Sequence, residues 1–424
     1  MNQSFSLDFI PILVENVEIN PFDSSSKADQ FLLISEGRVF NISENVVCLI
    51  ELISLKISLS EIIQRYNKNI QFAKMTLVNL NEFLNTFLLS NNLLQNGKKD
   101  STHPQEEKLR RGDLTFKFEI LKKETIFPIS NKLKILFNSK IRYPFYILYI
   151  LLTLVFFSLS YSQINLSFIT SLSASEYFYA YLFMIATMFV HEIGHASASR
   201  YLGVEHDDIG MGIYKIFFVL YTDVTYCWKL DRKDRILVNI GGMYFQTIFL
   251  IVLQILYLFT PSNFLFVLIL WEQLSLVTSL NPFIKLDGYW IISDSLGIPN
   301  LSKKVYKFSQ YIRSKIFLEE SENPFLDIKQ KQRYLFYIYS SLTIIVLFLA
   351  LFYFLKLTPD FYSSYFYLIK DTFFQIDTVS TPTKSIFSET VTFLLINFFI
   401  FMNLRSLIPK LILKIKKQKQ EITQ

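Results

Sequence analysis

Two histidines and a glutamate in the stretch Phe-Val-His-Glu-Ile-Gly-His could bind a metal ion and use it. His191 and His195 are four residues apart, so on a helix their imidazoles share one face and can bind the same ion. Glu192 lies beside them and can accept a proton from a metal-bound water. The chain has only four histidines, and this spacing predicts a Zn²⁺ site with Glu192 as general base. The alternative is a pair of histidines hydrogen-bonded between helices.

The segment 280–290, Leu-Asn-Pro-Phe-Ile-Lys-Leu-Asp-Gly-Tyr-Trp, offers a third metal ligand. A catalytic zinc site uses three protein ligands and an open fourth position. Pro282 can end the preceding helix and Gly288 lets the chain turn, so an unwound helix end could present the carboxylate of Asp287. We expect Asp287 to complete the site. The alternative is an aspartate in an ordinary interfacial turn before aromatic residues.

The composition indicates a membrane protein with a soluble extension. The 424 residues are 51% hydrophobic and only 18% charged, and the mean hydropathy is +0.32, whereas a soluble domain carries roughly 25% charge. The two cysteines do not suggest a disulfide-rich domain, and four histidines are too few for the metal cluster of a membrane desaturase. The net charge of +6 does not indicate nucleic acid binding, because Lys and Arg gather beside the apolar segments and at the C-terminus.

Six apolar segments approach the roughly 20 residues that a helix needs to cross a bilayer. They are residues 144–163, 177–201, 234–260, 264–282, 334–356 and 388–410. Lys and Arg are abundant in alternate connections, which predicts an even number of spans with both termini in the cytoplasm. No signal peptide is evident at the N-terminus. The histidine motif then lies inside the bilayer, nearer its cytoplasmic face.

The expected fold is mainly α, a polytopic membrane helical bundle of about six spans with a re-entrant β-hairpin, plus a small N-terminal α+β domain of winged-helix-like type. The expected parts are a small N-terminal domain, a linker, the membrane core, and a cytoplasmic amphipathic segment with the last spans, at residues 1–95, 96–113, 114–300 and 301–424. In the first part we expect short strands and then three helices, at residues 31–41, 43–54, 58–66 and 74–94.

Residues 209–226, between the two motifs, are β-branched and aromatic and predict a hairpin or re-entrant strand pair. An exposed strand edge there could hold an extended substrate by β-addition. The alternative is an interfacial hairpin that only plugs the bundle. We expect Asp223 and His206 to be turn or surface residues rather than ligands.

Other polar and aromatic segments have less specific interpretations. Glu272 and Gln273 lie inside a predicted span, where we favour hydrogen bonds to a neighbouring helix over a water path to the zinc. Residues 302–317 space aromatic residues between basic ones, which suits a helix lying on an anionic leaflet. The aromatic-rich residues 357–387 are expected to form a loop on the opposite surface.

The two motifs resemble those of the intramembrane zinc metalloproteases of the site-2 protease (M50) family. The similarity is strongest to a branch of peptide zinc metalloproteases found in bacterial gene clusters for modified peptides and bacteriocins, whose members pair an HExxH helix with an N-P-x-x-x-x-D-G-Y segment. Residues 218–230 also look like that branch, and the resemblance covers about residues 140–300. The chain departs from one family pattern: Gly241-Gly242-Met243 stands where many site-2 proteases carry Ala-Gly-Pro.

The resemblance implies roles for individual residues. His191, His195 and Asp287 would bind zinc, Glu192 would be the general base, and Asn281 would help hold the substrate or its oxyanion. The N-terminal part resembles, more weakly, the PqqD-like fold, whose members bind leader segments of ribosomally made peptides; the alternative is a winged-helix-like module with an unrelated partner.

The expected function is that of a zinc metalloendopeptidase in the bacterial cytoplasmic membrane, which processes a peptide precursor or a membrane-embedded peptide. Expected partners are the substrate, the lipid bilayer and a peptide exporter or modifying enzyme, with no nucleic acid. Two alternatives stay open. One is a regulatory protease that cleaves a membrane-anchored regulator, and the other is a non-catalytic scaffold for peptide export or immunity.

Overall fold

The computed structural model describes residues 4–27, 29–35, 38–68, 74–96, 114–160, 172–214, 217–318 and 323–374. The chain divides into two compact units, one of Met1–Gly212 with Phe218–Tyr337 and one of Ile213–Phe217 with Ile338–Gln424. Almost all of the predicted linker 96–113 and the whole predicted span 388–410 lie outside the described residues.

The N-terminal part of the first unit is an antiparallel sheet followed by helices, as the sequence predicts. The strands β1 (Glu18–Pro21), β2 (Gln30–Ser35) and β3 (Arg38–Ser43) pair in the order β1-β2-β3. The helices α1 (Glu44–Ser54), α2 (Leu59–Asn67) and α3 (Leu77–Phe83) follow, and α3 continues into a π-helical turn, Leu84–Leu89. The strand β1 is not predicted, and the predicted helix over 74–94 starts later and ends at Leu89.

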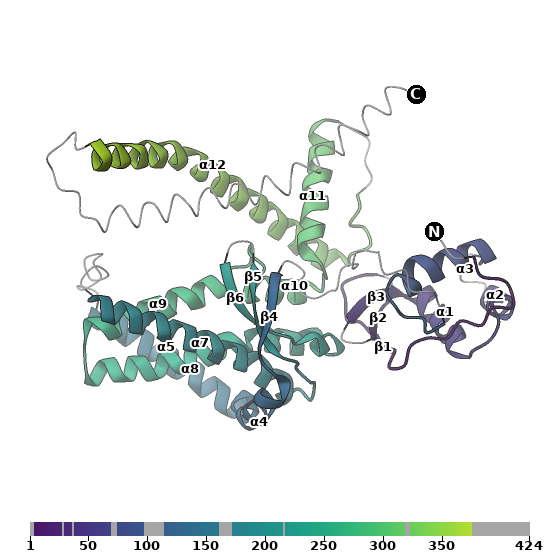
Figure 1. Cartoon of the computed structure of the whole chain (residues 1–424), viewed down its shortest axis with the longest axis horizontal. Coiled ribbons are helices and arrows are strands. Elements are labelled where there is room, and N and C mark those ends of the chain that lie inside the picture. Colours follow the sequence, from purple (N-terminus) through teal and green to yellow (C-terminus); the bar gives the residue numbers. More distant parts are fainter. Residues whose placement is uncertain are drawn as a thin grey trace. The chain divides into compact units, whose positions relative to one another are not determined.

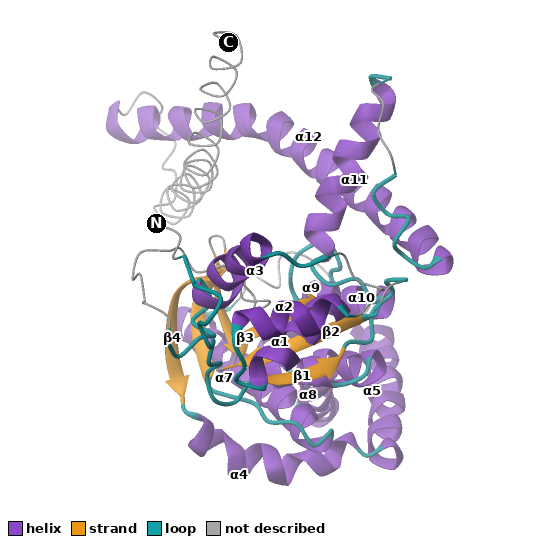
Figure 2. Cartoon of the chain, turned by 90° about the vertical axis from the view of Figure 1, so that its right-hand side faces the viewer, coloured by secondary structure: helices purple, strands orange, loops and turns teal. Residues whose placement is uncertain are grey.

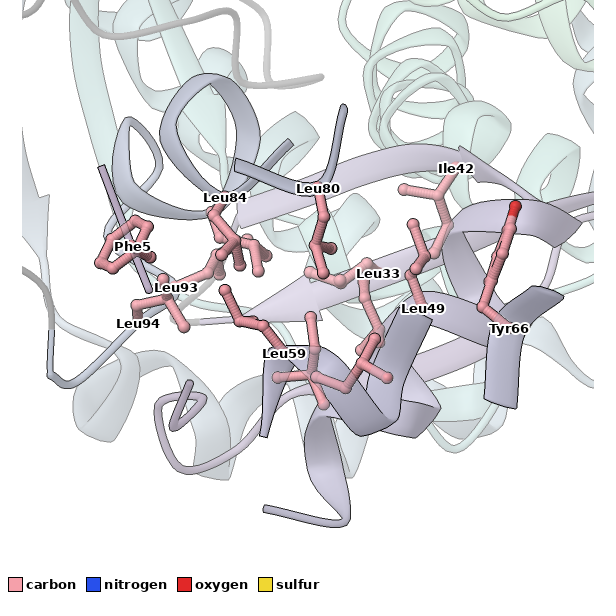
Figure 3. Close-up of a cluster of buried hydrophobic side chains, with 14 residues drawn as sticks. Phe5, Leu33, Ile42, Leu49, Leu59, Tyr66, Leu80, Leu84, Leu93 and Leu94 are labelled. Carbon is pink, nitrogen blue, oxygen red and sulfur yellow. The ribbon is translucent and has the colours of Figure 1, made fainter. Parts of the chain in front are cut away.

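Two faces of this small sheet are buried. Leu33 and Ile42 pack under the helices in a cluster drawn entirely from residues 5–94, and Figure 3 shows these two side chains together with Leu49, Leu59 and Leu80. On the other face Leu32, Ile34 and Val39 pack with Phe22. Figure 2, in which strands are orange, shows α1 lying along β2 and β3. The alternation of side chains along each strand supplies both apolar layers.

Four long helices form the bundle that carries the two motifs: α5 (Ser139–Ser160), α7 (Ala174–Tyr201), α8 (Arg232–Phe259) and α9 (Asn263–Ser279). They run side by side in Figure 1, and α8 packs against each of the other three. Two thirds (67%) of the apolar window of α8 is buried, against 11% for α5. The helix α8 is therefore the centre of the bundle, and α5 presents most of its surface outward.

Three helices of the described part are long and apolar enough to cross a membrane, whereas six spans are expected over the whole chain. They are Ser139–Ser160, Arg232–Phe259 and Gln330–Leu349. The predicted span 264–282 is the apolar helix α9 of only 17 residues. The predicted span 177–201 is the helix α7, which carries the histidine motif and has Arg200 in its last turn. The structure is consistent with membrane association through these apolar helices.

A second antiparallel sheet lies beside the bundle. The predicted hairpin is confirmed as β5 (Ile209–Tyr214) and β6 (Phe217–Thr222), but a third strand, β4 (Leu114–Leu121), pairs with β5, in the order β4-β5-β6. Leu-Thr-Phe-Lys-Phe-Glu-Ile-Leu alternates apolar and polar residues, and that period-two pattern is a strand signal. At Gly210 a Cβ atom would lie 2.7 Å from the Phe118 carbonyl oxygen, so glycine lets β4 approach β5 there.

Shorter helices and 3₁₀ turns connect the second sheet with the bundle and follow the bundle in sequence. After β4 come α4 (Lys123–Leu133) and the 3₁₀ turn Lys134–Phe137; the 3₁₀ turn Thr225–Lys229 follows β6, and α10 (Asp287–Leu296) follows α9. The helix predicted over 302–317 is confirmed as α11 (Leu301–Ile316).

The loop expected over 357–387 is wrong for its first part. The helix α12 runs from Gln330 to Phe374 and contains Pro359, and residues 375–387 lie outside the described part.

His206 is a core residue, which corrects the expectation of a surface position. Its side chain is fully buried, with 0% exposed. Both ring nitrogens have hydrogen-bond partners there: Nδ1 lies 2.9 Å from the Asp207 carbonyl oxygen, and Nε2 lies 2.8 Å from Ser130 Oγ. Nδ1–H donates to the carbonyl, and Nε2 accepts from the serine hydroxyl. Asp223 is a turn residue as expected, since its Oδ1 accepts from the Thr225 amide at 3.1 Å.

His206 makes the stability of the protein depend on pH. Burial lowers the pKa of its imidazole from the ordinary value of 6.5, and the nearby Arg200 and Lys123 act in the same direction. The unfolded chain therefore binds a proton that the folded chain does not, and stability is lost as the pH falls below about 6.5. We expect His206→Gln to be destabilised by about 1–3 kcal/mol at neutral pH, but to lose less further stability on acidification.

The measurement is the thermal unfolding midpoint of detergent-purified wild type and His206→Gln across the range from about pH 7.5 to about pH 5.5. Both proteins keep every other histidine, so the difference between the two curves isolates His206. Parallel curves would contradict this assignment.

Candidate metal centre

The helix α7 presents the two histidines and the glutamate inside the bundle. It begins at a capping box, in which Ser173 and Glu176 each bond the other's backbone amide. One turn separates His191 from His195, so both imidazoles face the same side. The side chains are buried, with 9% of His191, 5% of Glu192 and 2% of His195 exposed.

Asp287 joins the histidines from a different helix. It is the first residue of α10, and α9 ends eight residues earlier in sequence, at Ser279, so the break between the two helices presents the carboxylate. Gly288 makes this possible because a Cβ atom there would lie 2.2 Å from the Leu280 carbonyl oxygen. The close approach of α10 to the end of α9 therefore requires glycine.

The ligand atoms of the three residues converge on one point. His191 Nε2 lies 2.9 Å from Asp287 Oδ2, His195 Nε2 lies 3.5 Å from Asp287 Oδ1, and the two Nε2 atoms are 3.1 Å apart. All three side chains are buried, and one ligand atom from each lies within 4.8 Å of the others. Among the described residues this is the group of histidine, cysteine and carboxylate side chains that can hold a metal ion.

These spacings fit the ligand set of a tetrahedral zinc ion. Two nitrogens bonded to one tetrahedral zinc at 2.0–2.1 Å lie about 3.3 Å apart. Here the two Nε2 atoms are 3.1 Å apart, one Asp287 oxygen lies 2.9 Å from His191 Nε2, and the other lies 3.5 Å from His195 Nε2. His195 Nδ1 lies 2.8 Å from the Val238 carbonyl oxygen, so Nδ1–H donates and Nε2 keeps its lone pair. That lone pair points at another imidazole nitrogen, an arrangement that a shared cation stabilises.

Glycines bring the backbones of α7 and α8 together at the centre. A Cβ atom on Gly194 would lie 2.3 Å from the Gly241 carbonyl oxygen, and one on Gly241 would lie 2.8 Å from the Gly194 carbonyl oxygen. A Cβ atom on Gly242 would lie 2.4 Å from His191 Nε2 and 2.6 Å from His195 Nε2. The Gly-Gly pair therefore leaves the space that the imidazoles and an ion between them need.

Thr222 is a site residue that the sequence did not reveal. Its Oγ1 donates to Glu192 Oε2 at 2.8 Å and lies 2.9 Å from the Glu192 carbonyl oxygen. Thr222 is the last residue of β6 and is 3% exposed. The second sheet therefore orients the carboxylate that lies next to the ligands in sequence. In the sequence, only the position of Thr222 in the predicted hairpin could have indicated this role, since a single threonine forms no motif with a fixed spacing.

Asn281 lies in the turn between α9 and α10. Its Oδ1 accepts from the Phe283 amide at 2.9 Å, and its own amide donates to the Thr278 carbonyl oxygen at 3.0 Å. The side chain is half-buried. Asn281 thus shapes the connection that ends at Asp287, and a role in holding substrate stays a prediction.

Glu272 and Gln273 of α9 form the hydrogen bonds to neighbouring helices that the sequence predicts. Glu272 Oε1 accepts from Thr187 Oγ1 of α7 at 2.7 Å, one helical turn before His191. Gln273 Oε1 accepts from Tyr149 OH of α5 at 2.6 Å, and its Nε2 donates to Thr153 Oγ1 at 3.2 Å. The prediction of bonds to neighbouring helices is confirmed.

A cleft of about 220 Å³ opens beside Thr222. Strands β4 and β6 supply part of its wall, and α8 and α10 supply Asn239 and Trp290. Carboxylates from Glu119, Asp208 and Asp223 also line it. The candidate general base is therefore one hydrogen bond away from a space that opens to solvent.

Comparison with known proteins gives one informative similarity. The chain is 23% identical over 177 residues to the Bacillus subtilis (strain 168) protein named "Putative peptide zinc metalloprotease protein YydH", and the match covers 40% of this chain and 69% of that protein. No family model matches the chain, and no solved structure matches it. The similarity supports a distant relationship to zinc metalloproteases.

The geometry at Gly242 predicts that a single added methyl group disturbs the centre. Gly242→Ala should weaken zinc binding by about 10- to 100-fold, because its Cβ would overlap both ligand nitrogens and α8 cannot move away from the Gly194 contact. The measurement is zinc affinity of the detergent-purified protein by chelator competition.

Gly203→Asn is the matched control. Gly203 has a positive φ of +79°, and no other atom lies within 4 Å of the place that a Cβ atom would take there. Asparagine tolerates that backbone region, so this variant should bind zinc like wild type. Wild-type affinity in Gly242→Ala would show that the ion does not lie between these imidazoles.

Proposed function

We propose that this chain is an intramembrane zinc metalloendopeptidase of the site-2 protease (M50) type, which processes a peptide precursor or a membrane-embedded peptide. The observation that carries the proposal is the convergence of His191, His195 and Asp287 from two helices, with Glu192 beside them and hydrogen-bonded to Thr222. The distant similarity to a protein named as a peptide zinc metalloprotease supports the same class.

The residues divide the work between holding an ion and moving a proton. His191, His195 and Asp287 would hold Zn²⁺, which when bound supplies a Lewis acid and an acidified water. Glu192 would be the residue that accepts a proton from the attacking water and gives it to the leaving amine. Thr222 fixes the orientation of the Glu192 carboxylate, and the Val238 carbonyl oxygen fixes the tautomer of His195.

The second sheet offers a way to present the substrate. In the described part of the chain β6 pairs only with β5 and is the edge of the sheet, and its last residue contacts Glu192. A peptide added along β6 as a further strand would be extended, as proteolysis requires, and would lead toward Glu192. Asn281 would help hold the substrate or its oxyanion from the opposite connection.

The N-terminal domain is the proposed selector of substrate. Its small antiparallel sheet with three helices and a core of its own is consistent with a PqqD-like domain that binds a leader segment. The pathway would be the maturation of a modified peptide or bacteriocin at the bacterial cytoplasmic membrane, beside an exporter or modifying enzyme, with both termini in the cytoplasm.

Two variants separate the chemistry from the metal. Glu192→Gln keeps the size of the side chain and should retain about one zinc per chain, while cleavage falls about 10²- to 10⁴-fold because the proton acceptor is gone. Asp287→Ala should lose cleavage together with zinc. The measurements are metal content of the purified protein and hydrolysis of fluorescently labelled casein in detergent.

The same preparations decide between the alternatives. Cleavage of a tagged single-helix membrane protein but not of casein would favour a regulatory intramembrane protease. A folded wild type without zinc would overturn the proposal in favour of a non-catalytic scaffold. Cleavage unchanged in Glu192→Gln would exclude Glu192 as the general base and overturn the proposed mechanism.

The hydrogen bond from Thr222 predicts a second effect on rate. Thr222→Val removes a bond to a carboxylate, worth about 1.5–3 kcal/mol, so casein hydrolysis should fall by roughly 10-fold or more with zinc content unchanged. Thr222→Ser keeps the hydroxyl and is the control. Equal rates for the valine and serine variants would exclude an orienting role for Thr222.

A further inference from the structure

Arg235 joins three parts of the structure from a buried position. Only 1% of the residue is exposed, and a buried guanidinium is stable only when its donors are satisfied. Nε donates to Asp294 Oδ1 of α10 at 2.6 Å. Nη1 donates to the Leu230 carbonyl oxygen at 2.7 Å, and Nη2 donates to the Asp23 carbonyl oxygen at 3.3 Å. The side chain thus links α8 with α10 and with the N-terminal domain.

Two aromatic rings lie against the guanidinium of Arg235, one from the N-terminal domain and one from the turn before α8. Its central carbon lies 5.0 Å from the ring centre of Phe22 and 5.5 Å from that of Trp228. Phe22 belongs to the apolar layer of the N-terminal sheet, and Trp228 packs against that layer. Cation–π contacts add to the ionic bond with Asp294.

The segment Phe22–Lys27 of the N-terminal domain also closes the far end of α10. That helix ends at Leu296, and the next residue, Gly297, caps it with a φ of +63°. The Ser25 amide donates to the Gly297 carbonyl oxygen at 2.8 Å, and Ser25 Oγ donates to the Leu296 carbonyl oxygen. A Cβ atom at Gly297 would lie 2.6 Å from Ser25 Oγ. The segment around Ser25 therefore packs so closely against the end of α10 that position 297 has no room for a side chain.

The helix held in this way is the one that presents Asp287. Asp294 is two turns after Asp287, about 10 Å along the same face of a helix. Its second oxygen, Oδ2, accepts from Asn239 Nδ2 at 2.8 Å. Asn239 follows Val238, whose carbonyl oxygen orients His195. One short stretch of α8 therefore fixes both a histidine ligand and the helix that carries the carboxylate ligand.

We propose that Arg235 is a positioning residue for the metal centre, and that the segment Phe22–Lys27 is the element through which the N-terminal domain sets the position of α10 and so of Asp287. The inference rests on the proposed metal site and adds a regulator to it. Because coupling between two sites is reciprocal, a peptide that shifts this segment on binding the N-terminal domain changes metal affinity, and the metal changes affinity for the peptide.

The test measures the metal centre itself in full-length, detergent-purified protein. Zinc affinity is determined by chelator competition, and the absorption spectrum of the Co²⁺-substituted protein reports ligand geometry. Arg235→Met should bind zinc about 10- to 100-fold more weakly and show an altered Co²⁺ spectrum. Ser25→Val, which touches α10 only at its far end, should show a smaller change in the same direction.

Gln254→Met is the matched control. Gln254 lies on the same helix, is 1% exposed and donates to Thr153 Oγ1 at 2.9 Å, so its loss removes a buried hydrogen bond without touching α10. It should leave affinity and spectrum as in wild type. An equal loss of affinity in this control would overturn the inference, because general loosening of the bundle would then explain the effect.

If Arg235→Met fails to fold, Ser25→Val and Asp294→Asn test whether these contacts position the metal centre. Wild-type affinity and an unchanged Co²⁺ spectrum in both would overturn the positioning role, while loss of zinc in Asp287→Ala would still support the metal site. A wild type that binds no zinc would instead overturn the proposed function, and this inference with it.

Discussion

The contact between the backbones of α7 and α8 at Gly194, Gly241 and Gly242 is the constraint on which the centre depends. Only at that distance can His195 reach the Val238 carbonyl oxygen while both imidazoles stand over Gly242. Small residues let helices approach closely in apolar surroundings, where packing rather than water exclusion holds them. The site is therefore built from main chain as much as from side chains, and the central helix of the bundle is also the floor of the metal centre.

The polar groups of the bundle follow from the same apolar setting. An unpartnered polar group is costly there. Polar side chains of neighbouring helices therefore form hydrogen bonds with one another, such as Thr187 with Glu272 and Gln254 with Thr153. Arg235 and Asp294 show the rule at its strongest, because two buried charges share several donors and acceptors. Such pairs fix the rotation of each helix about its axis, and that rotation decides which residues reach the centre.

Much of the candidate site could be predicted from sequence because helical spacing and a helix-ending proline act locally. His191, His195 and Asp287 do converge, and the hairpin and the N-terminal strands and helices lie near their predicted positions. The role of Thr222, the pairing of β4 with β5 and the buried state of His206 could not be predicted in the same way, since each depends on a partner distant in sequence. The number of spans stays a prediction, because three helices of the described part meet the length and hydropathy that a span needs and the predicted span 388–410 lies outside that part.

The partner of His195 Nδ1 is a carbonyl oxygen of the main chain, and that has a consequence for how the protein can vary. A carboxylate or amide in this role would be lost by a single codon change, whereas every amino acid at position 238 supplies the same acceptor. Inherited variation can reach this bond only by displacing α8, for instance by a side chain too large for the fully buried space around Val238. The tautomer of the ligand is thus insulated from any substitution that leaves the backbone of α8 in place.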